Sequence, residues 1–307
     1  MRRFTQCTEQ LFRAEPQNVI LGAMLGPEIV VRSLSVPTIA DDYGNVWQYF
    51  PQSDRHSKVA CWTILFDLLQ RCPLLRRHIA EEKVGFGINH TMIDFTADRQ
   101  KDLDLVLTIP RAETPGAPVG RIFADLADRY AIVLTDAERE VLRGLPELRE
   151  RPVGEVLVAL EAKATMGAHV RAGPRLFDEL TSAGQCINGS APHAIAIGFG
   201  MVNASVEFVS PGMNKGPLAG RVSVVSRERQ PNGVERTIGR FRSLRVRGHA
   251  TERGYDAIGV MTIVARNDGT PITLAPIPPA LPPGDSLHYE TMVLRASGLY
   301  DSRFLTR

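Results

Sequence analysis

The chain has 307 residues, of which 44% are hydrophobic and 23% are charged, and its formal net charge is +2. These fractions are typical of a globular protein and exclude a wholly disordered chain, a collagen-like fibre and a disulfide-stapled miniprotein. No segment approaches the roughly 18 consecutive apolar residues of a transmembrane helix. Arg2 and Arg3 have no apolar segment behind them, so no secretory signal is expected and a cytoplasmic location is predicted.

Lysine and cysteine are both used sparingly. Only five of the 36 basic residues are lysines, so the position of each lysine is informative. The four cysteines are scattered without CxxC spacing, which argues against a zinc site. We expect Cys61 and Cys72, which lie in an apolar stretch, to be buried thiols.

The first part of the chain predicts an extension, a helix and a β-hairpin. Residues 1–57 form an N-terminal extension, with short strands expected at 19–25, 29–36 and 45–50. Apolar residues at helical spacing predict a core helix over 58–70, capped by Ser57. The alternation that follows predicts a hairpin with strands over 86–95 and 103–109.

The rest of the chain predicts an α/β fold with a central mixed sheet flanked by helices. Residues 111–150 are expected to form a helical insertion. Beyond it, a strand, a helix and a strand are predicted at 156–160, 174–183 and 193–205, an order that indicates a parallel crossover. Residues 206–307 are expected to extend the same domain as a basic α/β segment. Its predicted helix, strand and last helix lie at 234–244, 254–270 and 286–300.

An acidic residue and a lysine follow the apolar strand 156–160. Residues two apart on a strand point to the same face, so Glu161 and Lys163 share one. Such a pair is costly at the end of a buried strand unless it is paired or bound to a metal. Asp104, which opens the apolar run of a neighbouring strand, could reach the same place. Two carboxylates and the backbone carbonyl of Ala162 would make a hard oxygen site for Mg²⁺.

The segments LDLVL, with Asp104, and VLVALEAK, with Glu161 and Lys163, resemble the PD-(D/E)XK core of restriction-endonuclease-like nucleases. The resemblance covers residues 58–205 and implies the order αβββαβ, with residues 111–150 outside the core. It implies that Asp104, Glu161 and the Ala162 carbonyl hold Mg²⁺, and that Mn²⁺ can take its place. Lys163 would assist the water that attacks a DNA phosphodiester. It also implies a restriction or phage-defence setting.

The sequence departs from this pattern in two ways. Leu103 precedes the acid where the family has proline, and the separation from Asp104 to Glu161 is long. Asp94 and Asp102 are competitors for the role of first acid. A second E-x-K, at 81–83, lies in a polar helical stretch and is expected to be a solvated face.

Several other residues are candidates for accessory or DNA-binding roles. Asp67, Asp102 and His169 are possible accessory groups beside the metal. The arginines expected to contact DNA phosphates are Arg171, Arg175, Arg240 and Arg245. Each has a simpler alternative: a core hydrogen bond for Asp67, a capping role for His169 and a solvated surface for the arginines.

Three functional hypotheses follow. The first is a Mg²⁺-dependent DNA endonuclease, expected to be a homodimer because cutting a duplex needs one active site per strand. The second is a non-catalytic DNA-binding or assembly subunit with a nuclease-like fold. The third is an unrelated α/β protein in which Glu161 and Lys163 form a structural ion pair. No membrane partner is expected.

Overall fold

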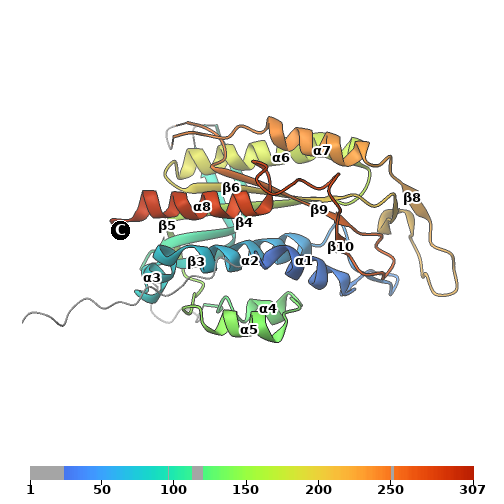
Figure 1. The fold of residues 1–307 in the computed structure, drawn as a ribbon, viewed down its shortest axis with the longest axis horizontal. Coiled ribbons are helices and arrows are strands. Elements are labelled where there is room, and N and C mark those ends of the chain that lie inside the picture. The colour runs from blue at the N-terminus through green and yellow to red at the C-terminus, as the bar shows by residue number, and fades with distance from the viewer. Residues whose placement is uncertain (1–23, 96, 113–119, 250–251) are drawn as a thin grey trace, which may run out of the picture.

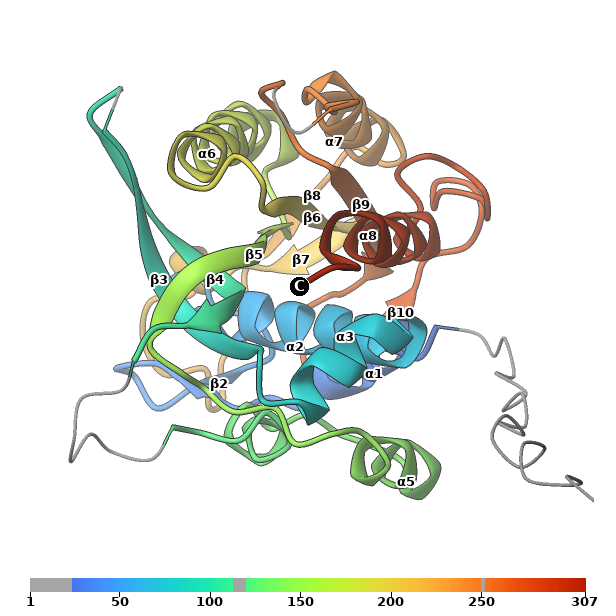
Figure 2. The same ribbon diagram turned by 90° about the vertical axis from the view of Figure 1, so that its left-hand side faces the viewer.

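A computed structural model describes residues 24–95, 97–112, 120–249 and 252–307. Its centre is a six-stranded mixed sheet in the order β10-β9-β6-β5-β4-β3, with helices against both faces (Figures 1 and 2). The predicted α/β class, with a central mixed sheet flanked by helices, is therefore confirmed. The strands of this sheet are β3 Gly85–Asp94, β4 Arg99–Pro110, β5 Val153–Thr165, β6 Ile195–Asn203, β9 Ala257–Val264 and β10 Thr273–Leu274.

Two small two-stranded sheets and eight α-helices complete the described part of the chain. The small sheets are formed by β1 Ile39–Ala40 with β2 Val46–Trp47, and by β7 Glu207–Val209 with β8 Val225–Arg227; a 3-10 turn spans Pro211–Met213. The helices are α1 Gly26–Ser35, α2 Arg55–Arg71, α3 Pro73–Ala80, α4 Leu126–Arg129, α5 Asp136–Arg143, α6 His169–Ser190, α7 Asn232–Ser243 and α8 Tyr289–Phe304.

The sheet changes from antiparallel to parallel at β5. Strands β3, β4 and β5 pair antiparallel, whereas β5, β6 and β9 pair parallel, with α6 as the crossover from β5 to β6. The predicted crossover is thus present, and β9 continues the same sheet. From α2 to β6 the main elements follow the order helix, three strands, helix, strand, with the short α3 after α2. Helices α4 and α5 lie between β4 and β5 in the chain.

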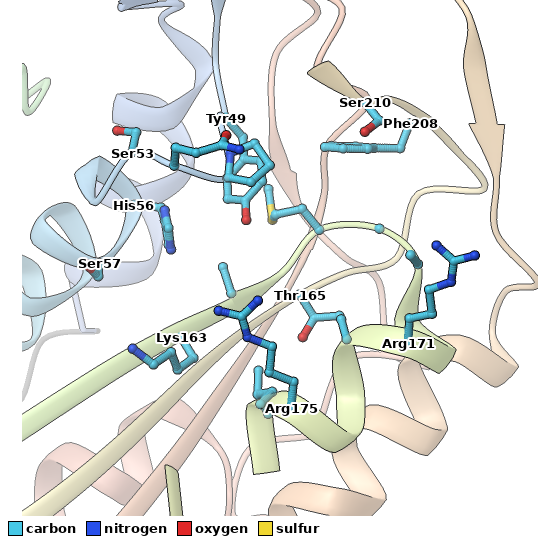
Figure 3. A pocket seen from close by; sticks show the side chains of 18 of the residues that line it. Tyr49, Ser53, His56, Ser57, Lys163, Thr165, Arg171, Arg175, Phe208 and Ser210 are labelled. Carbon is cyan, nitrogen blue, oxygen red and sulfur yellow. The ribbon is translucent and has the colours of Figure 1, made fainter. Parts of the chain in front are cut away.

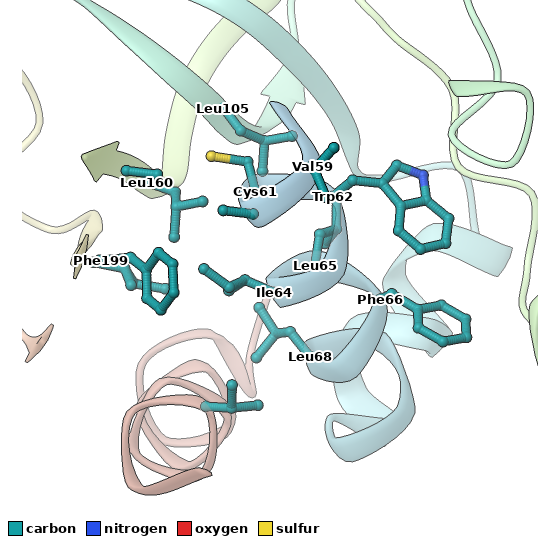
Figure 4. Packing of buried hydrophobic residues seen from close by; sticks show 14 of the residues in the cluster. Val59, Cys61, Trp62, Ile64, Leu65, Phe66, Leu68, Leu105, Leu160 and Phe199 are labelled. Carbon is teal, nitrogen blue, oxygen red and sulfur yellow. The ribbon is translucent and has the colours of Figure 1, made fainter. Parts of the chain in front are cut away.

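Helix α2 is buried on two sides. One side packs Ile64 and Leu65 toward β4, β5 and β6 (Figure 4). Trp62 stacks on Phe66 and on Phe123 of the insertion, with ring centroids 5.1 and 4.9 Å apart, and its indole N–H donates to the Phe123 carbonyl. The insertion therefore lies beyond α2 on the side away from the sheet, as both views show (Figures 1 and 2).

Helices α6 and α7 cover the opposite face. Leu176, Leu180, Ala183 and Ile187 form the apolar side of α6 and pack on β3, β4 and β5. The predicted helix 174–183 is part of this longer element, which begins at His169 and includes Pro174 within its first turns. Pro174 is the sixth residue of α6, so it removes one hydrogen bond within the helix near its start.

The prediction of a strand at 29–36 is wrong, because residues 29–35 belong to helix α1. Periodicity alone cannot separate a short apolar strand from a buried helix segment. Pro27 occupies the first turn of α1, a position that suits proline, and α1 packs on α2. Of the other two predicted N-terminal strands, 19–25 lies almost wholly outside the described residues. The segment 45–50 contains only the two-residue β2.

Within the described ranges, no helix combines the length and the apolar character needed to cross a bilayer. Cys61, Cys72 and Cys186 are buried free thiols, as predicted for the first two, and Cys7 lies outside the described residues.

Candidate active site between β4 and β5

The site lies where β4 and β5 separate. The ladder between these strands ends at Leu105 opposite Leu160. Just beyond this pair, the Ala162 N–H donates to Asp104 Oδ2 at 2.9 Å, so a side-chain oxygen accepts the hydrogen bond that a backbone carbonyl of β4 would otherwise accept. β5 itself continues to Thr165, paired with β6. Glu161, Ala162 and Lys163 therefore lie inside a strand, not beyond its end as the sequence suggested.

Glu161 and Lys163 form a close pair of unequal exposure. The Lys163 Nζ lies 2.7 Å from Glu161 Oε1, and the side chains are 25% and 1% exposed respectively. Glu161 Oε2 is buried and has no hydrogen-bond partner among the described residues. A buried carboxylate oxygen without a partner is rare in proteins and calls for an explanation, such as an ion bound during function.

The electrostatics of the pair follow from this burial. Burial, followed by the negative charge of Asp104, raises the pKa of Glu161 to about 7, although Lys163 opposes the shift. Burial alone would lower the pKa of Lys163, but the charges of Glu161, Asp104 and Glu179 outweigh it and raise that pKa. Lys163 therefore stays protonated near neutral pH while Glu161 is held close to its titration point.

Asp104, Ala162 and Lys163 line an open cleft of about 710 Å³. Three segments distant in the sequence form the rest of its wall: the loop before α2 with the first turn of α2, the start of α6, and the β7–β8 region. In Figure 3, Lys163, Arg171 and Arg175 lie on one side of this space, while Tyr49, His56 and Phe208 lie on the other.

Helix α6 brings two of the predicted DNA-binding arginines to the cleft. Arg171 and Arg175 both line it and are exposed. Arg175 Nε donates to Glu179 Oε1 at 2.7 Å, and the other oxygen of Glu179 lies 3.9 Å from Lys163 Nζ. Glu179 was not predicted as a site residue. The sequence does contain a signal for it: Glu179 follows Arg175 by four residues, and residues four apart lie on the same face of a helix.

His56 and Tyr49 also belong to the site although the sequence did not predict them as site residues. Both line the cleft and both are half-buried. Their rings lie 5.1 Å apart at an interplanar angle of 54°. Burial lowers the pKa of His56 to about 4, so the ring is neutral at pH 7. The predicted helix 58–70, capped by Ser57, excluded His56, but α2 begins at Arg55 with Asp54 at its N-cap position. Nothing local in the sequence indicates that this end of the helix faces Lys163.

Two of the predicted accessory acids do not reach the cleft. Asp67, on the sheet-covering helix α2, accepts hydrogen bonds from the N–H groups of Leu25 and Gly26 and from the Tyr289 hydroxyl. It therefore caps the start of α1 inside the core. Asp102 is exposed on β4 and accepts a hydrogen bond from the Thr91 hydroxyl at 2.5 Å.

The remaining predicted residues lie around the site without lining it. His169 is buried at the start of α6, where its Nδ1 lies 3.3 Å from an oxygen of Glu228, and Glu228 is the member of this pair that lines the cleft. Arg240 of α7 packs against Gly173 of α6, and Arg245 is exposed beyond α7. Neither arginine is among the described residues that line the cleft.

Comparison with protein-family models, with curated proteins and with solved structures finds no match to this chain. What the site can do therefore rests on its own geometry.

The donors at the β4–β5 separation fit a small divalent cation. In the described part of the chain, no three His, Cys, Asp or Glu side chains gather closely enough to hold a metal ion. The available set is two carboxylates, Asp104 and Glu161, with the Ala162 carbonyl between Glu161 and Lys163. This set suits Mg²⁺, which is usually held by one or two carboxylates together with substrate phosphates and water. The unpartnered Oε2 of Glu161 is the observation that favours such a ligand.

Proposed function

We propose that this protein is a Mg²⁺-dependent endonuclease that hydrolyses DNA phosphodiester bonds. The observation that carries the proposal is the convergence of Asp104, Glu161 and Lys163 where β4 and β5 separate: Asp104 and Lys163 line an open cleft, and the buried Glu161 pairs with Lys163 behind it. The order helix, three strands, helix, strand from α2 to β6 supports it, because the PD-(D/E)XK resemblance implies that order.

Each residue has a distinct part in the proposed reaction. Asp104, Glu161 and the Ala162 carbonyl would hold Mg²⁺, or Mn²⁺ in its place. When bound, the ion would neutralise a phosphate oxygen and lower the pKa of a water molecule. Lys163 is protonated at neutral pH, so it orients the attacking water and offsets negative charge in the transition state. Arg171 and Arg175 would contact phosphates next to the one that is cut.

The chain contains a matched control for testing this site. Lys83 belongs to the second E-x-K, at 81–83; it is exposed, lies beyond α3 and pairs with Glu81. Plasmid and oligonucleotide cleavage is measured with Mg²⁺ and with EDTA for the wild type, Lys163→Ala and Lys83→Ala. We expect cleavage by the wild type and by Lys83→Ala, and a loss of cleavage with EDTA and in Lys163→Ala.

The other outcomes assign the chain differently. Wild-type protein that binds DNA in a gel shift but does not cut it would overturn the endonuclease proposal and support a non-catalytic DNA-binding subunit. If the wild type neither binds nor cuts DNA, both DNA-related hypotheses are refuted and Glu161 and Lys163 form a structural ion pair. Cleavage of an RNA strand but not of DNA would overturn the assignment to DNA. A discrete band pattern would support the restriction setting that the resemblance implies.

A further inference from the structure

We propose that Tyr49 and His56 form a base-stacking subsite in the cleft, and that the preferred substrate is therefore single-stranded DNA. This inference rests on the proposed function, because it takes the strand held by the subsite to be the one that Lys163 serves. Neither aromatic residue belongs to the Asp104–Glu161–Lys163 set or is needed for metal binding.

The aromatic residues form one wall of the cleft. Tyr49 precedes α2 and His56 lies in its first turn, and both rings are partly exposed to the cleft (Figure 3). Phe208 of β7 is 3% exposed and contacts Tyr49 edge-on, with ring centroids 6.2 Å apart and an interplanar angle of 63°. Phe208 therefore packs against the Tyr49 ring within the same wall, and the less buried Tyr49 and His56 present ring surface to a ligand.

The buried side chain of Asn267 fixes the backbone of this aromatic wall through hydrogen bonds. Asn267 is 3% exposed and adopts a left-handed backbone conformation, with φ of 60°, in the turn after β9. Its Oδ1 accepts from the Tyr49 N–H at 2.9 Å, and its Nδ2 donates to the carbonyls of Tyr49 and Val209 at 3.0 and 2.9 Å. Asn267 thus joins the segment that bears Tyr49 to the strand that bears Phe208, so the aromatic wall is pre-organised.

The opposite wall carries three cationic side chains, together with the acidic Glu179, which pairs with Arg175 and lies 3.9 Å from Lys163 Nζ. Lys163, Arg171 and Arg175 face the aromatic side across the cleft (Figure 3). A positively charged groove that follows the backbone, combined with aromatic rings on which bases stack, is the usual arrangement for single-stranded nucleic acid. In an intact duplex the base faces are covered by neighbouring base pairs, so Tyr49 could contact a base only after it had left the stack. Single-stranded DNA avoids that cost.

The test measures binding separately from cleavage. Fluorescence anisotropy in EDTA, where the DNA stays uncut, compares a labelled single strand with a blunt duplex of the same sequence. We expect the wild type to bind the single strand more tightly. We expect Tyr49→Ala to weaken single-strand binding roughly 5- to 100-fold, as loss of one base–aromatic stack predicts, and to leave duplex binding unchanged. Tyr49→Trp should retain the single-strand preference.

Tyr43→Ala is the matched control, because Tyr43 is 48% exposed in the turn between β1 and β2 and does not line the cleft. Thermal unfolding of each variant checks that it is folded. A fluorescent base analogue in the single strand should be quenched by the wild type and by Tyr49→Trp, and not by Tyr49→Ala. Equal binding of the single strand by the wild type and a folded Tyr49→Ala, or tighter binding of the duplex by the wild type, overturns the subsite.

The two proposals fail in different ways. Tyr49-dependent binding of single strands without any Mg²⁺-dependent cleavage would refute the nuclease and leave the subsite standing. Lys163-dependent cleavage that is faster on duplex and insensitive to Tyr49→Ala would refute the subsite and leave the nuclease standing.

Discussion

At the scale of single residues, Glu161 is the most unusual group in the site. It is almost fully buried beside Asp104, with one close cation and one oxygen that has no partner among the described residues. Active sites commonly keep such groups because function requires a charge where the fold alone would not place one. The fold tolerates Glu161 at a cost that depends on pH.

That cost can be measured. The pKa of Glu161 is raised from its usual 4.5 to about 7 in the folded protein. Between these values the folded state binds more protons than the unfolded state, so the free energy of unfolding falls as pH rises. We expect the wild type to lose about 3 kcal/mol relative to Glu161→Gln between pH 4.5 and pH 8 in the absence of Mg²⁺. Urea unfolding of both proteins at several pH values tests this, and parallel pH profiles would contradict it.

At the scale of elements, helix α2 connects the central sheet to the insertion, because one of its sides packs on the sheet and the other packs on the insertion. One side packs on the sheet (Figure 4). On the other side Trp62 stacks on Phe66 and on Phe123 of the insertion. The same helix carries His56 at its start, inside the cleft. The packing of α2 thus sets the position of one wall of the candidate site.

Trp62→Ala should detach the insertion from α2. Trp62 is 1% exposed, so the truncation leaves a cavity and removes the hydrogen bond to the Phe123 carbonyl. We expect the free energy of unfolding to fall by about 3–5 kcal/mol and protease cleavage within 120–148 to become faster. Denaturant unfolding and limited proteolysis measure the two effects. Destabilisation with an insertion that stays equally protected would show that other contacts hold it.

At the scale of the whole molecule, the cleft is built from segments that span most of the described chain. The loop before α2, strands β4 and β5, the start of α6 and the β7–β8 region all contribute to it. The turn after β9 adds Asn267, which ties two of these parts together. A change far from the chemistry, in that turn, would therefore alter the cleft.

Oligomeric state separates two modes of cleavage. Cutting both strands of a duplex at once predicts a homodimer, with one Asp104–Glu161–Lys163 set for each strand. Size-exclusion chromatography with light scattering should then give twice the chain mass of 33.8 kDa, and twice that mass plus the mass of the DNA when a duplex is bound. The duplex should be cut without nicked intermediates. A monomer that nicks or degrades single strands would contradict the dimer and agree with the stacking subsite.

Local patterns in the sequence determined most of the secondary-structure elements of the core and part of the candidate site. The period of two places Glu161 and Lys163 on one face of β5, and the apolar runs and turn residues locate β3 to β6, α2, α7, β9 and α8. These features could be predicted because each depends on residues close together in the chain.

Only the tertiary structure decided the rest, because it depends on contacts between distant residues. Asp67 caps a helix 41 residues before it and receives a hydrogen bond from Tyr289, 222 residues after it. Its position on a helix could not distinguish that role from a place beside a metal. Most of the apolar run 29–36 forms helix α1, which packs on α2, and this long-range contact is not visible in the local sequence. Tyr49 reached the cleft because Asn267, 218 residues away, holds its backbone, and no local pattern records a contact across that distance.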